Sequence, residues 1–122
     1  MATRFEFQKS YEKDLEKIME LYLTKSRAVP AVKILERIYK LYAKDNKFVR
    51  QYMLVRSLEK IPKSTIQEIL TDLLRIRAIR NQGAKRTVSL YQPTLDQLGK
   101  RLKGHGQDLK RIHEDLLKKE EK

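Results

Sequence analysis

Apolar residues recur at helical spacing through the first third of the chain. Between Tyr11 and Tyr22 they fall at i, i+4, i+7, i+8 and i+11, which forms one face of a helix and predicts a first helix over about 8–26. Pro30 suits the first turn of a second helix. The turn-forming residues Lys44–Lys47 interrupt the pattern, so the second helix is expected to end there.

A short strand, two helices and a turn are predicted next. The pair Phe48-Val49 can form a short strand, and a third helix is predicted from Gln51 to about Leu58. Proline disfavours helix in the residue before it, so Glu59–Lys63 forms a turn and a fourth helix opens at Lys63 or Ser64. This fourth helix is expected to bury Ile66, Ile69, Leu70, Leu73 and Leu74. It is expected to expose Ser64, Thr65, Gln67, Glu68, Thr71, Asp72 and Arg75.

After the fourth helix the spacing changes to that of a strand. A polar stretch, 80–86, is centred on Gly83, and apolar residues then alternate with polar ones until Pro93-Thr94 stops the strand. Two short strands around a glycine-containing tip predict a β-hairpin. Thr94, with Gln97 three residues later, has the form of a capping box and predicts the start of the last helix.

The last helix, predicted over 94–118, has the most regular spacing in the chain. Its apolar seam has alternating gaps of three and four residues, as a coiled coil does, and comprises Leu95, Leu98, Leu102, His105, Leu109, Ile112 and Leu116. Gly104 and Gly106 each cost about 1 kcal/mol in a helix interior, so either the helix kinks there or two helices meet at a turn.

The length of this seam favours dimerisation over packing within the chain, because the alternation continues past what a single small core needs. The first helix contributes a second apolar face. The residues predicted to form the dimer are Leu15, Ile18, Tyr22, Leu98, Leu102, His105, Leu109, Ile112 and Leu116. His105, at a seam position, would fix the register of the dimer or belong to a kink.

The 122 residues fit one domain, mainly α with a small β-hairpin. The expected division is a packing helix at 8–29, a core at 30–93 and the heptad helix at 94–118. No apolar run approaches the roughly 18 residues of a membrane span, and the first residues do not form a secretory signal. These features predict a cytoplasmic protein with no membrane partner.

Charge adds the first indication of function. The formal net charge is +12, from 28 Lys and Arg against 16 Asp and Glu. The excess is regional, because residues 24–63 hold eleven bases and three acids, and residues 75–86 hold five bases and no acid. A strongly basic chain attracts polyanions, and nucleic acid is the commonest of these inside cells.

Catalysis and metal binding find no support in the sequence. The chain has no cysteine, its two histidines are eight residues apart and out of register on a helix, and no phosphate-binding or nucleophile motif is present. We therefore expect no enzyme activity, no cofactor and no metal.

The segment Val49–Ile66 resembles a helix-turn-helix, and Lys63-Ser64-Thr65-Ile66 resembles the start of the recognition helix in winged-helix proteins. Residues 73–79 resemble the exit into the wing, with Arg77-Ala78 where that family usually has a glycine. Tyr91-Gln92-Pro93-Thr94 resembles the close of the second wing strand. The resemblance covers about residues 30–95, and the added terminal helices are similar to those of dimeric MarR-like and PadR-like regulators.

The resemblance implies a winged helix-turn-helix core that binds double-stranded DNA as a homodimeric transcription regulator associated with the nucleoid. A recognition helix at 64–75 would enter the major groove, and a wing at 80–87 would lie on the backbone or minor groove. The predicted DNA contacts are Arg50, Gln51, Tyr52, Lys63, Ser64, Thr65, Gln67, Thr71, Arg75, Arg80, Gln82, Lys85 and Arg86. Glu68 and Asp72 would either pair sideways with Arg75 and neighbouring lysines, which we favour, or accept a hydrogen bond from cytosine.

Other functions stay open. A plasmid or chromosome partition protein would share the fold, bind a centromere-like site and spread along DNA through a further protein contact or self-association. A basic RNA-binding protein associated with the ribosome would prefer structured RNA. A protein-only adaptor would bind neither nucleic acid.

Overall fold

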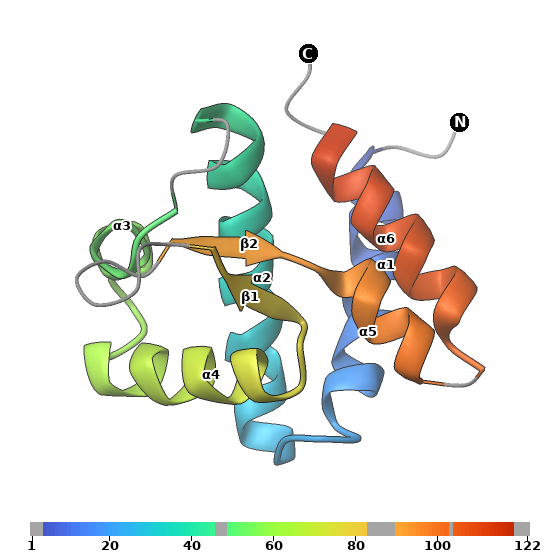
Figure 1. Cartoon of the computed structure of the whole chain (residues 1–122), viewed down its shortest axis with the longest axis horizontal. Helices are drawn as coiled ribbons and strands as arrows, with labels where there is room; N and C mark the ends of the chain where they lie inside the picture. The colour runs from blue at the N-terminus through green and yellow to red at the C-terminus, as the bar shows by residue number, and fades with distance from the viewer. Residues whose placement is uncertain (1–3, 46–48, 83–89, 103, 119–122) are drawn as a thin grey trace.

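The computed structural model describes residues 4–45, 49–82, 90–102 and 104–118. Within these ranges the chain forms six helices and two short strands. Their order is α1 (Arg4–Met19), α2 (Lys25–Asp45), α3 (Gln51–Ser57), α4 (Lys63–Arg75), β1 (Ile79–Asn81), β2 (Tyr91–Pro93), α5 (Leu95–Arg101) and α6 (Gly106–Lys118). The prediction of a mainly helical fold with a small β-hairpin is confirmed (Figure 1).

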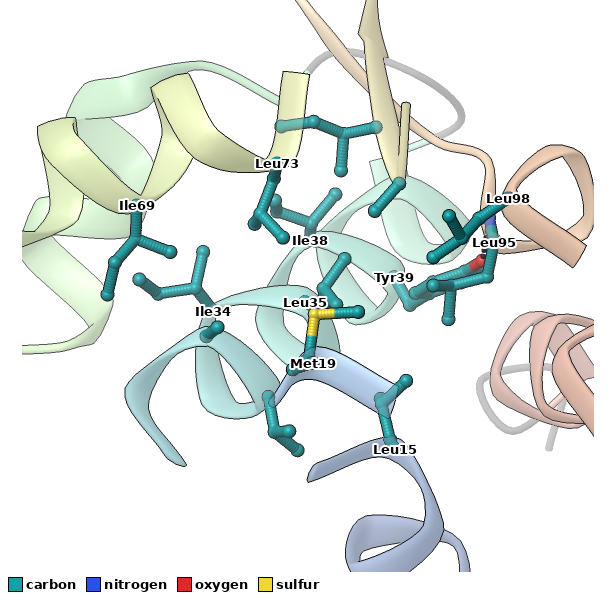
Figure 2. Packing of buried hydrophobic residues seen from close by; sticks show 14 of the residues in the cluster. Leu15, Met19, Ile34, Leu35, Ile38, Tyr39, Ile69, Leu73, Leu95 and Leu98 are labelled. Atoms are coloured by element: carbon teal, nitrogen blue, oxygen red, sulfur yellow. Dashed lines mark hydrogen bonds between the residues drawn. The ribbon is translucent and has the colours of Figure 1, made fainter. Parts of the chain in front are cut away.

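Helix α2 is the centre of the fold. It contacts α1, α3, α4, α6 and β2, and in Figure 1 it runs between α3, α4 and the hairpin on one side and α1, α5 and α6 on the other. Most of its apolar side chains are buried, because neighbours cover it on several faces rather than along one stripe. Figure 2 shows this core, with Leu15 and Met19 from α1, Ile34, Leu35, Ile38 and Tyr39 from α2, Ile69 and Leu73 from α4, and Leu95 and Leu98 from α5.

The boundary between the first two helices differs from the prediction. Helix α1 ends at Met19 because Leu21 and Tyr22 donate their N–H groups to the carbonyls of Ile18 and Met19, which tightens the chain into a turn. Helix α2 then begins at Lys25, not at Pro30. Pro30 lies inside the helix, where its missing N–H removes one backbone bond without ending a helix that is packed on several sides.

The predicted hairpin is formed, and a third segment joins it. Strands β1 and β2 are antiparallel, with Ile79 opposite Pro93 and Asn81 opposite Tyr91. Val49 makes an isolated bridge to Tyr91, whose N–H donates to the Val49 carbonyl at 2.8 Å. This bridge confirms strand pairing at Val49 and ties the start of α3 to the hairpin. Phe48 and the hairpin tip at 83–89 lie outside the described residues.

The α4–β1 connection is built on a residue with positive φ. Arg77 has φ 67°, and the N–H of Ala78 donates to the Leu73 carbonyl while that of Arg77 donates to Leu74. This is the Schellman arrangement that usually takes glycine at the left-handed position. Arg77 thus occupies a position at which glycine is the usual residue.

Thr94 closes this connection, and it is the N-cap residue of α5, as predicted. The predicted capping box is not formed, because the Thr94 side chain makes no bond to the helix N-terminus. The buried Thr94 hydroxyl donates instead to the Arg77 carbonyl at 3.0 Å, and its N–H donates to Ala78. The N–H of Leu95, which has no partner within the first turn of α5, donates to the Tyr39 hydroxyl. Tertiary partners therefore replace the local cap.

The segment predicted as the heptad helix, 94–118, forms two helices, α5 and α6. The helix is interrupted between α5 and α6, where Gly104 has φ 89°. The two helices pack on each other (Figure 1). They approach closely at Gly99 and Gly106, where a Cβ on Gly106 would lie 2.9 Å from the Gly99 carbonyl oxygen. Of the two alternatives that the glycines left open, two helices joined by a turn is confirmed.

This break changes the interpretation of the predicted dimer residues. Six of the nine are buried within the chain itself, namely Leu15, Ile18, Leu98, Leu109, Ile112 and Leu116. Leu102 and His105 are half-buried, and Tyr22 is exposed. Three-four spacing is also what a helix packed on its own domain requires, so here the seam is explained without a second copy.

Candidate nucleic-acid interface

Helix α4 presents a surface of uncharged polar side chains. Ile66, Ile69, Leu70 and Leu73 are buried against the core, and the opposite face is exposed. That face carries Ser64, Gln67 and Thr71, which we call the α4 stripe. The Thr71 hydroxyl donates to the Gln67 carbonyl, so its oxygen and methyl group remain for a partner. The outward orientation of the α4 stripe is as predicted; Thr65, beside it, is half-buried.

The two acids of α4 are held in ion pairs beside the stripe. Arg27 in the first turn of α2 contacts Glu68 at 2.5 Å and Asp72 at 3.2 Å, and Arg75 contacts Asp72 at 3.1 Å. The sideways pairing of Asp72 with Arg75 is confirmed. The contribution of Arg27 was not predicted, because it is 41 and 45 residues away in the sequence.

These ion pairs determine the charge that α4 offers to a polyanion. Two guanidinium groups and two carboxylates cancel locally, so the acids add little repulsion at the α4 stripe. Lys63 is exposed at the start of α4, and Arg75 stays exposed at its end although it pairs with Asp72. The surface is therefore close to neutral along most of α4 and basic at its start, where Lys63 has no described acid beside it.

The start of α3 adds exposed side chains next to the hairpin. Arg50 and Tyr52 are exposed, and Gln51 is half-buried. Val49 pairs with Tyr91 of β2, and Arg50 is the next residue of the chain, so Arg50 lies close to β2. Helix α3 also contacts α4, and α4 contacts β1, so the described candidate residues of α3, α4 and the base of the hairpin belong to one part of the molecule.

The hairpin is described only at its base. Arg80 is exposed on β1 opposite Gln92, and Gln82 is half-buried with its N–H bonded to the Leu90 carbonyl. Lys85 and Arg86 lie outside the described residues. The described base of the predicted wing thus contributes one exposed arginine.

A buried polar cluster lies on the opposite side of α2. The Tyr39 hydroxyl is 2.5 Å from His113 Nδ1 and accepts a bond from the Leu95 N–H, and His113 is 3.6 Å from Asp96. Burial lowers the pKa of His113, and Asp96 opposes that shift. Burial raises the pKa of Tyr39. These contacts join α2, α5 and α6.

Neither a metal-ion site nor a membrane-spanning helix is found in the part of the chain that the structure describes. In that part, no group of three or more His, Asp and Glu side chains has an arrangement that could hold a metal ion. No helix there combines the length and apolar character that crossing a bilayer requires.

Comparisons with known proteins add no assignment. The chain matches no protein-family model, no curated protein and no solved structure. The function must therefore be argued from the geometry and charge of the chain itself.

Proposed function

We propose that the chain binds double-stranded DNA as a winged helix, with α4 in the major groove and the β1–β2 hairpin as the wing. The observation that carries this proposal is the α4 stripe, an exposed row of hydrogen-bonding side chains whose neighbouring acids are already paired. Amide and hydroxyl side chains of this kind contact base edges in the major groove.

The order and pairing of the elements support this proposal. Helix α2, the bridge at Val49, helices α3 and α4, and then the paired strands β1 and β2 follow one another as in a winged helix-turn-helix. Helix α4 has 13 residues, about 20 Å, and lies at the lower left of the molecule in Figure 1. A helix at the edge of a fold can enter a groove about 12 Å wide.

The charge supports nucleic acid as the partner. The net charge of +12 and the exposed Arg50, Lys63 and Arg80 suit contacts with phosphates on either side of α4. A sequence-specific transcription regulator is the simplest role for such a surface. Since the heptad seam is buried within the chain, the proposal does not depend on a dimer.

The test is binding of the purified chain to three labelled probes, namely duplex DNA from upstream of its own gene, single-stranded DNA and structured RNA, at two salt concentrations. We expect the duplex to bind most tightly and the affinity to fall steeply with salt, because phosphate contacts release counterions. Gln67→Ala should weaken preference for the best duplex by about tenfold, whereas Gln107→Ala, an exposed glutamine on α6, should change nothing.

A footprint on the same duplex separates the possible roles. One protected site that saturates supports a regulator, and protection that lengthens with protein concentration supports partition. Tighter binding to structured RNA, or no duplex binding at either salt, would overturn the proposal.

A further inference from the structure

Arg27 is the one residue outside α4 that contacts both acids of that helix in the described structure. It is the third residue of α2, and its two terminal nitrogens go to different partners, Nη2 to Glu68 and Nη1 to Asp72. The Asp72 side chain is only 16% exposed, whereas the Glu68 side chain is 57% exposed. Arg27 thus bridges the first turn of α2 and the middle of α4.

The spacing of the two acids explains why this bridge matters. Glu68 and Asp72 are four residues apart and lie on neighbouring turns of one helix face, where like charges repel. The planar guanidinium presents donors in a fixed fork, so one arginine can engage both carboxylates at once. Within the described residues, Arg75 pairs with Asp72 from the same helix, whereas the ion pair of Glu68 is with Arg27.

We propose that Arg27 is a positioning residue of the α4 surface: it holds Glu68 and Asp72 to the side of the helix, so that the α4 stripe meets DNA without facing unpaired carboxylates. This inference rests on the proposed function. It assigns to Arg27 a role exerted through the acids, with no contact between Arg27 and the DNA.

The role can be separated from that of an ordinary phosphate contact. If Arg27 acts through the acids, its loss weakens DNA binding only while the acids are charged. If Arg27 itself binds a phosphate, its loss weakens DNA binding whether or not the acids are present. The two cases differ in a triple variant that removes all three charges.

The experiment compares the full-length chain with Arg27→Gln, with the triple variant Arg27→Gln/Glu68→Gln/Asp72→Asn, and with Lys40→Gln, on the best duplex at low salt. Lys40 is exposed about 20 Å farther along α2 and controls for the loss of one positive charge. Thermal unfolding of each variant checks that the fold is retained.

We expect R27Q to bind about fivefold more weakly than wild type, because Glu68 then loses its described partner and Asp72 keeps only Arg75. We expect the triple variant to recover wild-type affinity. K40Q should stay within about twofold of wild type. R27Q that binds like K40Q, or a triple variant as weak as R27Q, would overturn the role of Arg27 while leaving the proposed function intact. Failure of wild type to bind any duplex would overturn both.

Discussion

Arg77 adopts a backbone conformation that residues other than glycine rarely take, and contacts from elsewhere in the fold hold it there. Arg77 adopts φ 67° at the end of α4, a conformation that costs a residue with a Cβ about 1 kcal/mol or more. It is held there by the Schellman bonds and by the Thr94 hydroxyl on its carbonyl. The strain is local, and the junction that it allows joins α4 directly to β1.

Replacing this arginine with glycine should therefore stabilise the protein. We expect Arg77→Gly to raise the free energy of unfolding by about 0.5–1 kcal/mol, because glycine adopts positive φ without steric cost. Arg77→Ala removes the same side chain but keeps the Cβ, and should give no such gain. Urea unfolding measures both, and a glycine variant no more stable than the alanine variant would contradict the expectation.

At the scale of elements, the contact between α5 and α6 depends on two glycines. Gly99 is buried, and the backbone of each glycine occupies the space that a side chain on the other would need. The close approach lets Leu98 and Leu109 reach the core from neighbouring helices. A regular apolar spacing here reflects a helical hairpin, not a long seam.

Adding one methyl group at this contact should separate the helices. We expect Gly106→Ala to lower the free energy of unfolding by about 1–3 kcal/mol, since the obstructing atom is a backbone carbonyl that cannot rotate away. Lys110→Ala, at an exposed position of α6, is the matched control and should be nearly neutral. Equal thermal stability of the two variants would argue against a tight crossing.

At the scale of the whole molecule, Tyr39 and His113 join parts of the chain that are 74 residues apart. The neutral imidazole can accept a hydrogen bond from the Tyr39 hydroxyl at Nδ1, whereas the protonated ring carries a hydrogen on both nitrogens and cannot accept one. Burial keeps the pKa of His113 below its ordinary value near 6.5, so the unfolded chain takes up this proton at a higher pH than the folded chain.

Stability should for this reason decline as the solution becomes acidic. Below about pH 6.5 the unfolded state binds the extra proton first, so the free energy of unfolding falls as pH decreases toward the lowered pKa of His113. The stability that comes from neutral His113 is fully present above about pH 6.5. Urea unfolding at pH 7.5 and 5.5 should show the fall in wild type and a smaller one in His113→Gln; the same fall in both proteins would assign it to other groups.

The sequence predicted well what depends on neighbours along the chain. The bounds of α3 and α4, the buried face of α4 and the hairpin follow from local periodicity, proline and glycine. The end of α1 and the ion pairs of Arg27 depend on which segments meet in space. The glycines predicted an interruption of the last helix, but the choice of two packed helices over a kink depends on the contact between α5 and α6. The α4 stripe could thus be predicted, but the partner that neutralises its acids could not.

The central place of α2 has a consequence for how the molecule comes apart. Its buried side chains serve α4 and the hairpin on one side and α1, α5 and α6 on the other, so neither side has a complete core of its own. A disturbance in the α5–α6 hairpin therefore reaches α2, and through α2 the helix that carries the stripe. Unfolding should be cooperative across the chain, and no fragment made by removing the last two helices retains the packing that holds α4 in place.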